Sequence, residues 1–470
     1  MKTKVRVREA KMAKESIITL IHTNDLHSHL ENWPKIRRYL NAQQQNLKTA
    51  NNDVFTFDIG DALDRVNPLT EATLGTANIA LLNQAHYDGV TIGNNEGLSL
   101  PQTALNKLYD TAEFPVICAN IFDKKTGVRP SWATPISYQT AQDGTKIAVI
   151  GLTAPFPDSY PLRNWTVTDI WSLLTDLIKT ATKQADIIIL LSHLGIDTDR
   201  QIAKAYPAVD VILGAHTHHL LEHGEVINNT LLAAAGKWGR WIGKINLFIE
   251  NHKIVKKIAR VTITDELPKI AADDVEIAGY FTVGEQQLTA SKIAKLKEPL
   301  RRNDGTLMQE TLNMLKARTN TPAAFLSTGL FLTDLPVGYI NKNDLLKLLP
   351  HHMYPMVTEL DGQNLIRLLK EMHKNQMFMR GFKMVGLGFR GKALGDIVLD
   401  GIHYDLKLKQ WYYDNELIDE QKRYQIASLD YYKFLPFLPS IEIAGKNRII
   451  MEKILREELA DYLMQTYPLN

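Results

Sequence analysis

The chain has 470 residues, of which 45% are hydrophobic and 23% are charged, and its formal net charge is +2. These values are typical of a globular protein of two or three domains with sizeable cores. No apolar stretch is long enough to span a membrane.

Charge is unevenly distributed along the chain. The first fourteen residues hold six basic residues and one acidic residue, which leaves 48 basic and 51 acidic residues in the remainder. A slightly acidic body argues against a nucleic-acid enzyme, whose groove needs basic charge around the site. We expect residues 1–16 to form a basic, disordered leader. The alternatives are a tail that binds an anionic partner and a natural start at Met12.

The leader does not have the form of a signal peptide. Only Ile17–Ile21 provides an apolar run before the polar His22, whereas a signal peptide needs about 7–15 apolar residues and a cleavage site. Cys118 is the only cysteine, so an internal disulfide is excluded. We therefore expect a cytoplasmic protein without a membrane partner.

The first half of the chain alternates short apolar runs with helical patterns, which predicts layers of helix and sheet. The predicted strands are Ile17–Ile21, Val54–Asp58, Val90–Ile92, Val116–Ala119, Lys146–Gly151, Asp186–Leu191 and Val209–Leu213. The predicted helices are Pro34–Gln45, Ala72–His86, Leu100–Thr111, Ile170–Gln184 and Thr198–Tyr206. Later strands at Leu231–Ala235, Trp241–Ile249 and Ile254–Thr264 are expected to be antiparallel and to cover the second sheet of a sandwich.

A continuous polar pattern over Asp274–Pro299 predicts a linker helix, and a second α/β domain follows it. Predicted helices of this domain are Thr306–Thr319, Lys342–Leu349, Gly362–Lys374 and Asn447–Thr466. Its predicted strands are Ala323–Leu326, Met356–Leu360, Ile397–Tyr404 and Arg423–Ala427. The expected bounds are 17–270 for the first domain, 271–305 for the linker helix and 306–470 for the second domain.

Residues of metal-binding type follow several of the predicted strands. They lie in five turn-like segments: Thr23–His27, Ile59–Asp61, Ile92–Glu96, Leu191–Gly195 and Gly214–His218. The candidate ligands in these segments are Asp25, His27, Asp61, Asn94, His193, His216 and His218. Open sheets place their sites at the carboxyl ends of strands, so these side chains should converge. One such segment would be an ordinary loop, but five in this order predict a metal centre.

Carboxylate, amide and imidazole ligands together suit divalent ions such as Mn, Zn, Fe, Co and Ni. Two ions held roughly 4 Å apart need a shared ligand, and a carboxylate serves best. Asp61 is the expected bridge, because Gly60 and Ala62 leave room for both ions. The other ligands are expected to divide into a first site of Asp25, His27 and His218 and a second site of Asn94, His193 and His216. Paired ions activate a shared water and polarise a phosphoryl group.

The order of these motifs, Asn-Asp-x-His, Gly-Asp, Gly-Asn-x-Glu, Ser-His and Gly-x-His-x-His, resembles that of the calcineurin-like metallophosphoesterases. In the second half, Leu345–Pro350, Leu360–Gly362 and Gly386–Arg390 resemble the C-terminal domain of the 5′-nucleotidases. The resemblance covers nearly everything from Ile17 to Leu438. The Gly-Asn-Asn-Glu variant and the missing signal peptide are similar to the cytoplasmic bacterial (YunD-like) branch.

The resemblance implies a four-layer α/β/β/α phosphoesterase domain, joined by a linker helix to a smaller C-terminal α/β domain that binds the nucleoside. It also implies that substrate lies between the domains and that rotation of the second domain opens and closes the site. The metal roles given above agree with the motifs of the family.

Three departures from the family pattern concern catalysis and substrate binding. The first departure is at the position after the metal-binding Asn94. The family usually has a His there, and an Asp three residues further on orients this His. Here these positions hold Asn95 and Leu98. The His of the family stabilises the transition state and can protonate the leaving group. Asn95 is our catalytic candidate, although it can donate only a hydrogen bond and supplies neither charge nor proton.

The other departures lie in the second domain. The phosphate-binding Arg of the pattern Asn-Gly-Gly-x-x-Arg is replaced by Leu332, and an alkyl chain cannot replace a guanidinium. Arg380 and Arg390 are the candidate substitutes, unless they are ordinary surface arginines. The segment that carries a base-stacking aromatic has also changed, and Phe382 and Phe434 are the candidates to stack on a base, unless they belong to the core.

The sequence therefore predicts a hydrolase with two divalent metal ions as cofactors, similar to 5′-nucleotidases, whose partner is a small-molecule phosphate ester such as a nucleotide. A 2′,3′-cyclic-nucleotide or nucleotide-sugar phosphodiesterase is one alternative, because a diester carries less negative charge and depends less on the missing Arg. A catalytically weakened metal- and ligand-binding protein is another, because the His and Asp near Asn94 are absent. Base preference and oligomeric state do not follow from the sequence.

Overall fold

The computed structural model describes residues 16–48, 52–383 and 388–469. These residues form two compact units. The first unit contains the described residues up to Asp64 together with Thr73–Tyr280, and the second contains Arg65–Ala72 and the described residues from Phe281 onward. The predicted basic leader lies outside the described residues, apart from Ser16. Within the described ranges, no helix is both long and apolar enough to cross a membrane.

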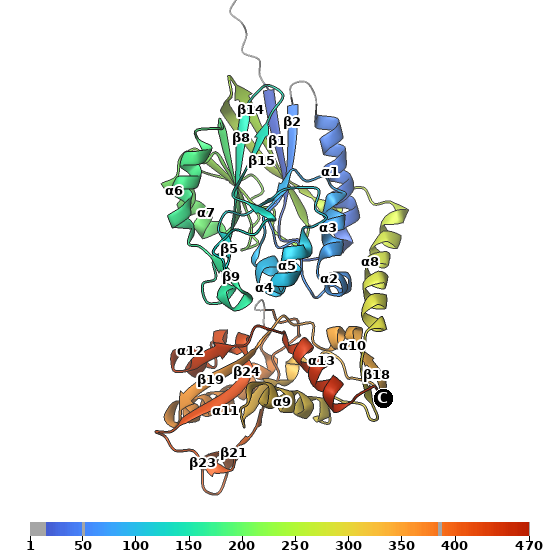
Figure 1. Ribbon diagram of the computed structural model, residues 1–470, viewed down its shortest axis with the longest axis vertical. Coiled ribbons are helices and arrows are strands. Elements are labelled where there is room, and N and C mark those ends of the chain that lie inside the picture. Colours follow the sequence, from blue (N-terminus) through green and yellow to red (C-terminus); the bar gives the residue numbers. More distant parts are fainter. Residues whose placement is uncertain (1–15, 49–51, 384–387, 470) are drawn as a thin grey trace, which may run out of the picture. The chain divides into compact units, whose positions relative to one another are not determined.

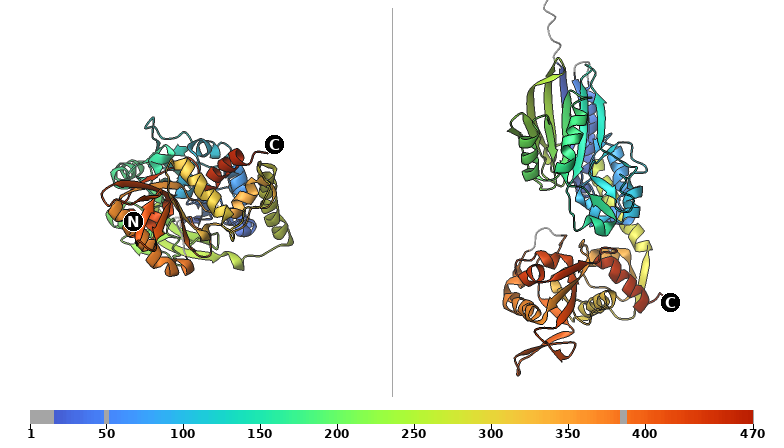
Figure 2. Two further views of the ribbon diagram at one scale, coloured as in Figure 1. Left: turned by 90° about the horizontal axis from the view of Figure 1, so that it is seen from below. Right: turned by 60° about the vertical axis from the view of Figure 1, so that its left-hand side comes forward.

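Two sheets face each other in the first unit (Figure 1; Figure 2, right). The first sheet runs in the order β15 (Lys253–Ile263), β14 (Trp241–Glu250), β1 (Ser16–Thr23), β2 (Asn52–Asp58), β3 (Gly89–Val90), β4 (Val116–Ile117) and β6 (Ala133–Thr134). The second runs in the order β12 (Glu225–Ile227), β13 (Thr230–Ala233), β11 (Val211–Gly214), β10 (Ile187–His193), β8 (Lys146–Thr153) and β7 (Ile136–Thr140). A short antiparallel pair is formed by β5 (Ile121–Asp123) and β9 (Trp165–Val167).

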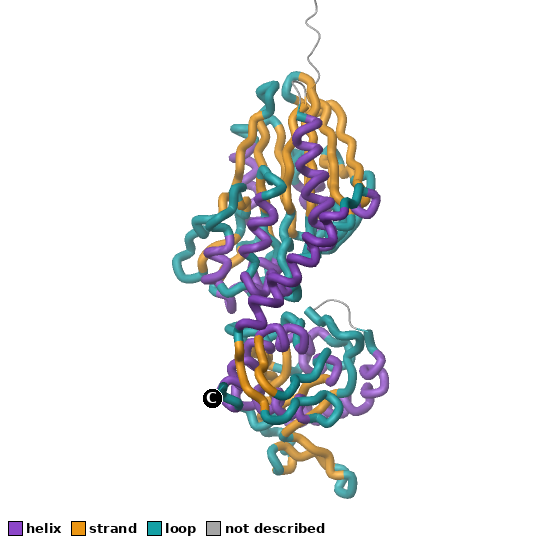
Figure 3. The backbone as a smooth tube through the Cα atoms, turned by 90° about the vertical axis from the view of Figure 1, so that its right-hand side faces the viewer, coloured by secondary structure: helices purple, strands orange, loops and turns teal. Residues whose placement is uncertain are grey.

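Helices cover the outer faces of both sheets. On the first sheet lie α1 (Trp33–Leu47), drawn along the strands in Figure 3, and α3 (Thr76–Asn83). On the second lie α6 (Ile170–Ala181) and α7 (Ile196–Ala205), while α4 (Asn94–Ser99) and α5 (Gln102–Leu108) follow β3. Inward-facing side chains of both sheets, such as Leu20, Phe57, Val149 and Ile189, form one buried layer. The predicted α/β/β/α architecture is confirmed.

The local sequence of α6 shows why a helix forms and how it docks. Asp169 caps its first turn by accepting a hydrogen bond from Ser172 N at 3.2 Å. Its buried residues recur at helical spacing and form one apolar stripe toward the second sheet: Ile170, Leu174, Ile178 and Ala181.

The prediction for the later strands was wrong in two respects. β13 is parallel to β11 in the second sheet. β14 and β15 do not cover that sheet but extend the first one, where β14 runs antiparallel to β1 and pairs Gly243 with His22. An apolar pattern reveals a strand but not its partner, which depends on where the chain crosses between sheets. The predicted helix Ala72–His86 is also interrupted, because Leu74 and Gly75 have positive φ values of 48° and 88° between α2 (Pro68–Thr73) and α3.

The second unit has a central sheet in the order β20 (Ile397–Asp400), β17 (Ala324–Ser327), β24 (Arg423–Leu429), β19 (Pro355–Asp361) and β25 (Lys446–Ile449). Its helices include α9 (Thr306–Thr319), α10 (Lys342–Leu348), α11 (Gly362–Gly381), α12 (Pro439–Ile443) and α13 (Leu455–Thr466). Smaller sheets pair β16 (Lys292–Leu296) with β18 (Gly338–Asn341), and β22 (Gln410–Tyr413) with β21 (Ile402–Asp405) and β23 (Glu416–Leu417). A continuous apolar core joins α9, α11 and the central sheet.

Two predicted helices of this half of the chain are shorter than expected. The linker helix α8 spans Ala271–Ala290, and the following residues form β16, in which Ile293, Ala294 and Leu296 are buried. The terminal helix begins only at Leu455, because residues 446–449 pair with β19 as β25. In both places long-range strand pairing overrides a local pattern that suits a helix. The helix Thr306–Thr319 has the predicted bounds.

Candidate metal centre

The loops that follow β1 and β2 lie side by side at the carboxyl ends of these parallel strands. Asp25 N donates to Gly60 O at 3.0 Å, and His27 N donates to Asp61 O at 2.8 Å. Asp25, His27 and Asp61 have φ values of 50°, 47° and 50°. Left-handed backbone disfavours most L residues and is tolerated best by Asn, Asp and His. The backbone therefore turns three candidate ligands toward one point at some cost in strain.

The loop after β11 approaches the same point from the second sheet. His216 and His218 also have left-handed backbones, with φ values of 74° and 57°. His216 N lies 3.2 Å from Asp25 Oδ1 and 3.1 Å from Asp25 Oδ2, so it donates to that carboxylate. The two sheets thus contribute to a single cluster.

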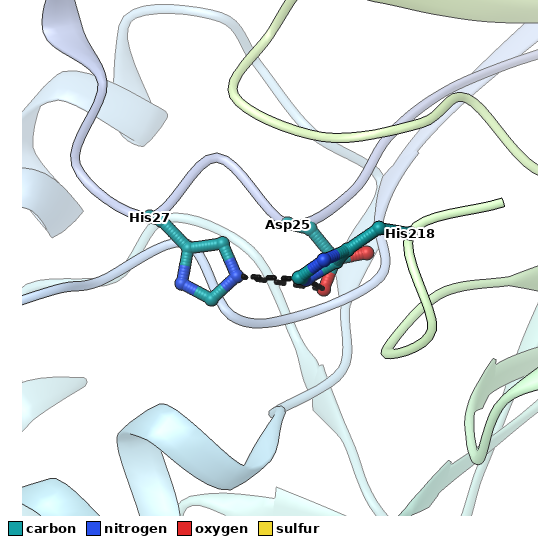
Figure 4. A group of neighbouring side chains, drawn as sticks. All are labelled: Asp25, His27 and His218. Carbon is teal, nitrogen blue, oxygen red and sulfur yellow. Dashed lines mark hydrogen bonds and ion pairs between the residues drawn. The ribbon is translucent and has the colours of Figure 1, made fainter. Parts of the chain in front are cut away.

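Asp25, His27 and His218 point toward a common centre (Figure 4). His27 Nε2 is 3.2 Å from His218 Nε2 and 3.8 Å from Asp25 Oδ1, and His218 Nε2 is 3.5 Å from the same oxygen. Three ligand atoms of carboxylate and imidazole type at these separations can surround one cation. This is the set of side chains predicted for the first metal.

Asp61 lies between this group and a second one. Its Oδ2 is 3.8 Å from His27 Nε2 and 3.4 Å from His193 Nε2. Asp25, Asp61 and His193 also have ligand atoms within 4.8 Å of one another. One oxygen of Asp61 therefore faces both histidines.

Two buried atoms in the second group lack hydrogen-bond partners among the described residues. His193 Nδ1 lies 2.7 Å from Ile59 O and donates to it, which leaves His193 Nε2 with a free lone pair. Asn94 Oδ1 is likewise buried and unpaired. Buried polar atoms are nearly always satisfied, so each of these two acceptors is suited to bind a cation. The His216 ring lies 5.3 Å from that of His193 and contributes to the same group.

The electrostatics of the cluster are those of carboxylates crowded into a low-dielectric site. Burial, reinforced by the charge of Asp61, raises the pKa of Asp25 to about 7. Burial would also raise the pKa of Asp61, but the nearby His193 and His27 rings and the Asn95 N–H together lower it below its usual range. Burial, together with the positive charges of His27 and Lys237, lowers the pKa of His218 to about 4. Unprotonated His218 is thereby available as a ligand.

Sequence reasoning missed Asn24, which positions the ligand Asp25. Asn24 Nδ2 donates to Asp25 Oδ2 at 2.9 Å and to Gly236 O at 2.7 Å, while Asn24 Oδ1 accepts from Ala235 N at 3.1 Å. One buried amide thus joins the first ligand loop to residues that follow β13. Its place directly before Asp25 was the only signal in the sequence.

Glu96 was also missed as a functional residue. Its Oε2 accepts from Asp61 N at 3.0 Å and from Gly93 N at 2.8 Å, and its Oε1 accepts from Leu63 N at 3.1 Å. Burial raises its pKa to about 7, although these N–H groups favour the charged form. Glu96 therefore fixes the segment that carries Asp61 against the segment that carries Asn94.

Asn95 is turned into the ligand loops. Its Nδ2 donates to Leu63 O at 2.9 Å and lies 2.9 Å from His27 Nδ1, and its backbone N donates to Asp61 Oδ1 at 2.7 Å. The side chain predicted to take the place of the catalytic His therefore contacts a candidate metal ligand.

The predicted substrate residues lie in the second unit and do not form one group. Arg380 is exposed, and its Nε pairs with Asp396 Oδ1 at 2.9 Å. Arg390 N donates to His351 Nδ1 at 2.9 Å. At the replaced Arg position, Leu332 N donates to Leu348 O as part of the backbone framework.

The two predicted stacking residues have different surroundings. Phe382 packs against Phe378 and Phe437, with ring centroids 5.9 and 4.7 Å away. Phe434 is 52% exposed and lies under Lys433 Nζ, 5.7 Å from its ring centroid. No ring contact joins Phe382 to Phe434 in the part of the chain that the structure describes. The neighbouring Tyr431 is buried, with its hydroxyl 2.9 Å from Ser327 Oγ.

A sandwich with helices on both faces and a cluster of carboxylate, amide and imidazole groups at its strand ends defines a metallophosphoesterase. The calcineurin-like phosphoesterase family matches residues 18–220, and the 5′-nucleotidase C-terminal domain matches residues 287–434. The uncharacterized metallophosphoesterase YunD of Bacillus subtilis is 37% identical to the chain over 464 residues, which are 95% of this chain and 99% of that protein.

Solved structures agree at the level of the fold. The NAD nucleotidase of Haemophilus influenzae matches 97% of each chain with a TM-score of 0.63 and 16% identity. The 5′-nucleotidase precursor of Thermus thermophilus matches 96% of this chain and 97% of its own, with a TM-score of 0.58 and 19% identity. The chain therefore belongs to the calcineurin-like phosphoesterases that carry a 5′-nucleotidase C-terminal domain, which are hydrolases of phosphate esters. The predicted family is confirmed.

Proposed function

We propose that the chain hydrolyses a nucleotide or a related organic phosphate at a centre of two divalent ions. The observation that carries this proposal is the position of Asp61, whose Oδ2 faces His27 at 3.8 Å and His193 at 3.4 Å. When bound, two divalent ions supply positive charge and lower the pKa of a bound water, and the attack of water on a phosphoryl group requires both. The first ion would be held by Asp25, His27 and His218, and the second by the other candidate ligands, Asn94, His193 and His216, with Asp61 shared.

The unpaired atoms Asn94 Oδ1 and His193 Nε2 support the second ion, because each is buried and has a lone pair that could bind a metal ion. Asn95 would act by positioning. Its contact with His27 holds this candidate metal ligand in place. Because its amide also donates a hydrogen bond to Leu63 O, Asn95 does not serve as the proton donor. The relatives named 5′-nucleotidase support a nucleotide as substrate.

Metal analysis and a substrate panel test the proposal together. Purified protein should contain about two equivalents of transition metal and hydrolyse at least one of AMP, a 2′,3′-cyclic nucleotide, a UDP-sugar and bis-p-nitrophenyl phosphate in the presence of Mn. His193→Ala should abolish that hydrolysis and lower the metal content. His223→Ala is the matched control, since this histidine also follows β11 but belongs to no candidate ligand group among the described residues. A protein without metal and without turnover of any of these esters would refute the proposal.

The second candidate is a phosphodiesterase. The engagement of Asn95 with Leu63 and His27 favours it, because no proton donor stands at the position of the family His. A diester with a good leaving group depends less on such a donor. If the protein hydrolyses diesters but not monoesters, the phosphodiesterase is established and the 5′-nucleotidase activity is excluded.

A further inference from the structure

The segment Gly236–Arg240, which we call the KW loop, lies against the first group of ligands but belongs to no metal site. It joins β13 to β14, where the chain passes from one sheet to the other. Trp238 N donates to Asp25 O at 2.8 Å, and Asn24 Nδ2 donates to Gly236 O at 2.7 Å. The KW loop is therefore fastened to the backbone and to the positioning amide of a candidate ligand loop.

The conformation of the KW loop is sterically disfavoured. Trp238 has a φ of 64°, between Gly236 at 65° and Gly239 at 62°. A bulky residue with positive φ is a rare conformation that its surroundings must impose. At Gly239 a Cβ atom would meet Ile36 Cδ1 at 2.6 Å, so the loop is also packed tightly against the domain. Such imposed backbone is typical of segments that hold a ligand.

The ring of Trp238 contacts two cationic side chains and a histidine ring. Lys237 Nζ lies 4.2 Å and Arg240 Cζ 4.7 Å from the centroid of its ring. His29 stacks on it at 4.6 Å with an interplanar angle of 28°. The aromatic ring thus acts as a platform that holds both cationic groups through cation–π contacts.

Neither cation has a carboxylate partner in the described part of the chain. No ion pair involves Lys237 or Arg240 there. The nearby Glu31 pairs with His29 at 2.6 Å, and the charge of Arg240 contributes to lowering the pKa of Glu31. Lys237 and Arg240 can therefore pair with an anion that approaches the KW loop. The Trp238 ring is already covered by three groups, which argues against a nucleobase as the occupant.

We propose that Lys237 and Arg240 form a subsite for a second phosphoryl group of the substrate, adjacent to the one that is hydrolysed. The planar guanidinium of Arg240 can donate two hydrogen bonds to phosphate oxygens, and the ammonium of Lys237 attracts them as a point charge. This inference rests on the proposed function and narrows its substrate class to compounds with two adjacent phosphoryl groups, such as nucleoside diphosphates. A monophosphate would leave the subsite empty.

Kinetics with paired substrates test the subsite. Lys237→Gln and Arg240→Gln should each lower kcat/KM for ADP by about tenfold, and the double variant by about 100-fold, as expected for charge-assisted hydrogen bonds. The kcat/KM for AMP should change less than about threefold, because a monophosphate does not reach the KW loop. Lys237→Arg should retain most of the activity on ADP.

Lys256→Gln is the matched control. Lys256 also lies over an aromatic ring, that of Phe248 at 5.5 Å, but Phe248 pairs with Ile17 at the far end of β1 from the ligands. Equal losses on AMP and ADP in the KW-loop variants would overturn the subsite, as would no loss on either. A loss of the same size in Lys256→Gln would overturn it as well.

Direct binding separates this proposal from the proposed function. Mn-loaded protein is titrated with inorganic pyrophosphate and with inorganic phosphate. The subsite predicts that each KW-loop variant weakens pyrophosphate about tenfold and leaves phosphate within about threefold. If the native chain binds no metal and hydrolyses none of the esters of the substrate panel, the proposed function fails, and the titration alone decides the subsite. Unchanged pyrophosphate affinity in the double variant refutes it.

Discussion

One buried carboxylate holds three backbone N–H groups of the ligand loops, so its replacement should disturb both loops at once. Glu96 is 2% exposed, and its oxygens accept from Asp61 N, Gly93 N and Leu63 N at 3.0, 2.8 and 3.1 Å. Glu96→Gln keeps the shape but replaces one oxygen with an NH₂ group, so at least one N–H loses its acceptor. A buried donor left unpaired costs about 1–3 kcal/mol.

We therefore expect Glu96→Gln to lower the free energy of unfolding by about 2–3 kcal/mol, and Glu96→Ala, which frees all three N–H groups, by about 4–6 kcal/mol. Because the Asp61 loop loses an anchor, Mn affinity should fall about 10–100-fold. Urea denaturation and Mn titration measure the two effects. Glu113→Gln is the control, since Glu113 is an exposed glutamate of the same unit. A Gln variant within about 0.5 kcal/mol of the native chain, with unchanged Mn affinity, would refute the reasoning.

Other predictions concern metal content, buried charge and pH. Chelation of the metals should lower the Tm by roughly 5–10 °C, because ions that bind only the folded state stabilise it, and a Tm that does not respond to EDTA would contradict this. Asn94→Ala should reduce bound metal from about two equivalents to about one, as elemental analysis can show. Arg456→Met should cost about 3–5 kcal/mol in urea denaturation, because it breaks the buried pair in which Arg456 Nη2 lies 2.6 Å from Glu71 Oε2. Burial raises the pKa of Asp430 to about 7. Its stabilising effect is therefore complete below about pH 4 and is lost as the pH rises through 7, so Asp430→Asn should stabilise the protein at pH 8 and not at pH 4.

The candidate site was largely predictable because its chemistry is encoded locally. Each ligand follows a strand, and the carboxyl ends of neighbouring parallel strands meet at one edge, so Asp25 and Asp61 had to approach each other once β1 and β2 paired. Residue type then restricts the ligand, since carboxylate and imidazole groups in turns suit divalent cations. The helix Thr306–Thr319 was predictable for a similar reason, because its pattern needs no distant partner.

Other features depended on contacts between segments that are distant in the sequence. The pattern of Trp241–Ile249 predicts a strand, but only the crossing from β13 to β14 places that strand beside β1. The same crossing brings the KW loop against Asp25, and long-range hydrogen bonds give Asn24 and Glu96 their positions. Local periodicity and residue type determined which chemistry the strand ends could carry. Tertiary structure decided which charges surround it, because hydrogen bonds and packing between distant segments leave no periodic trace in the chain.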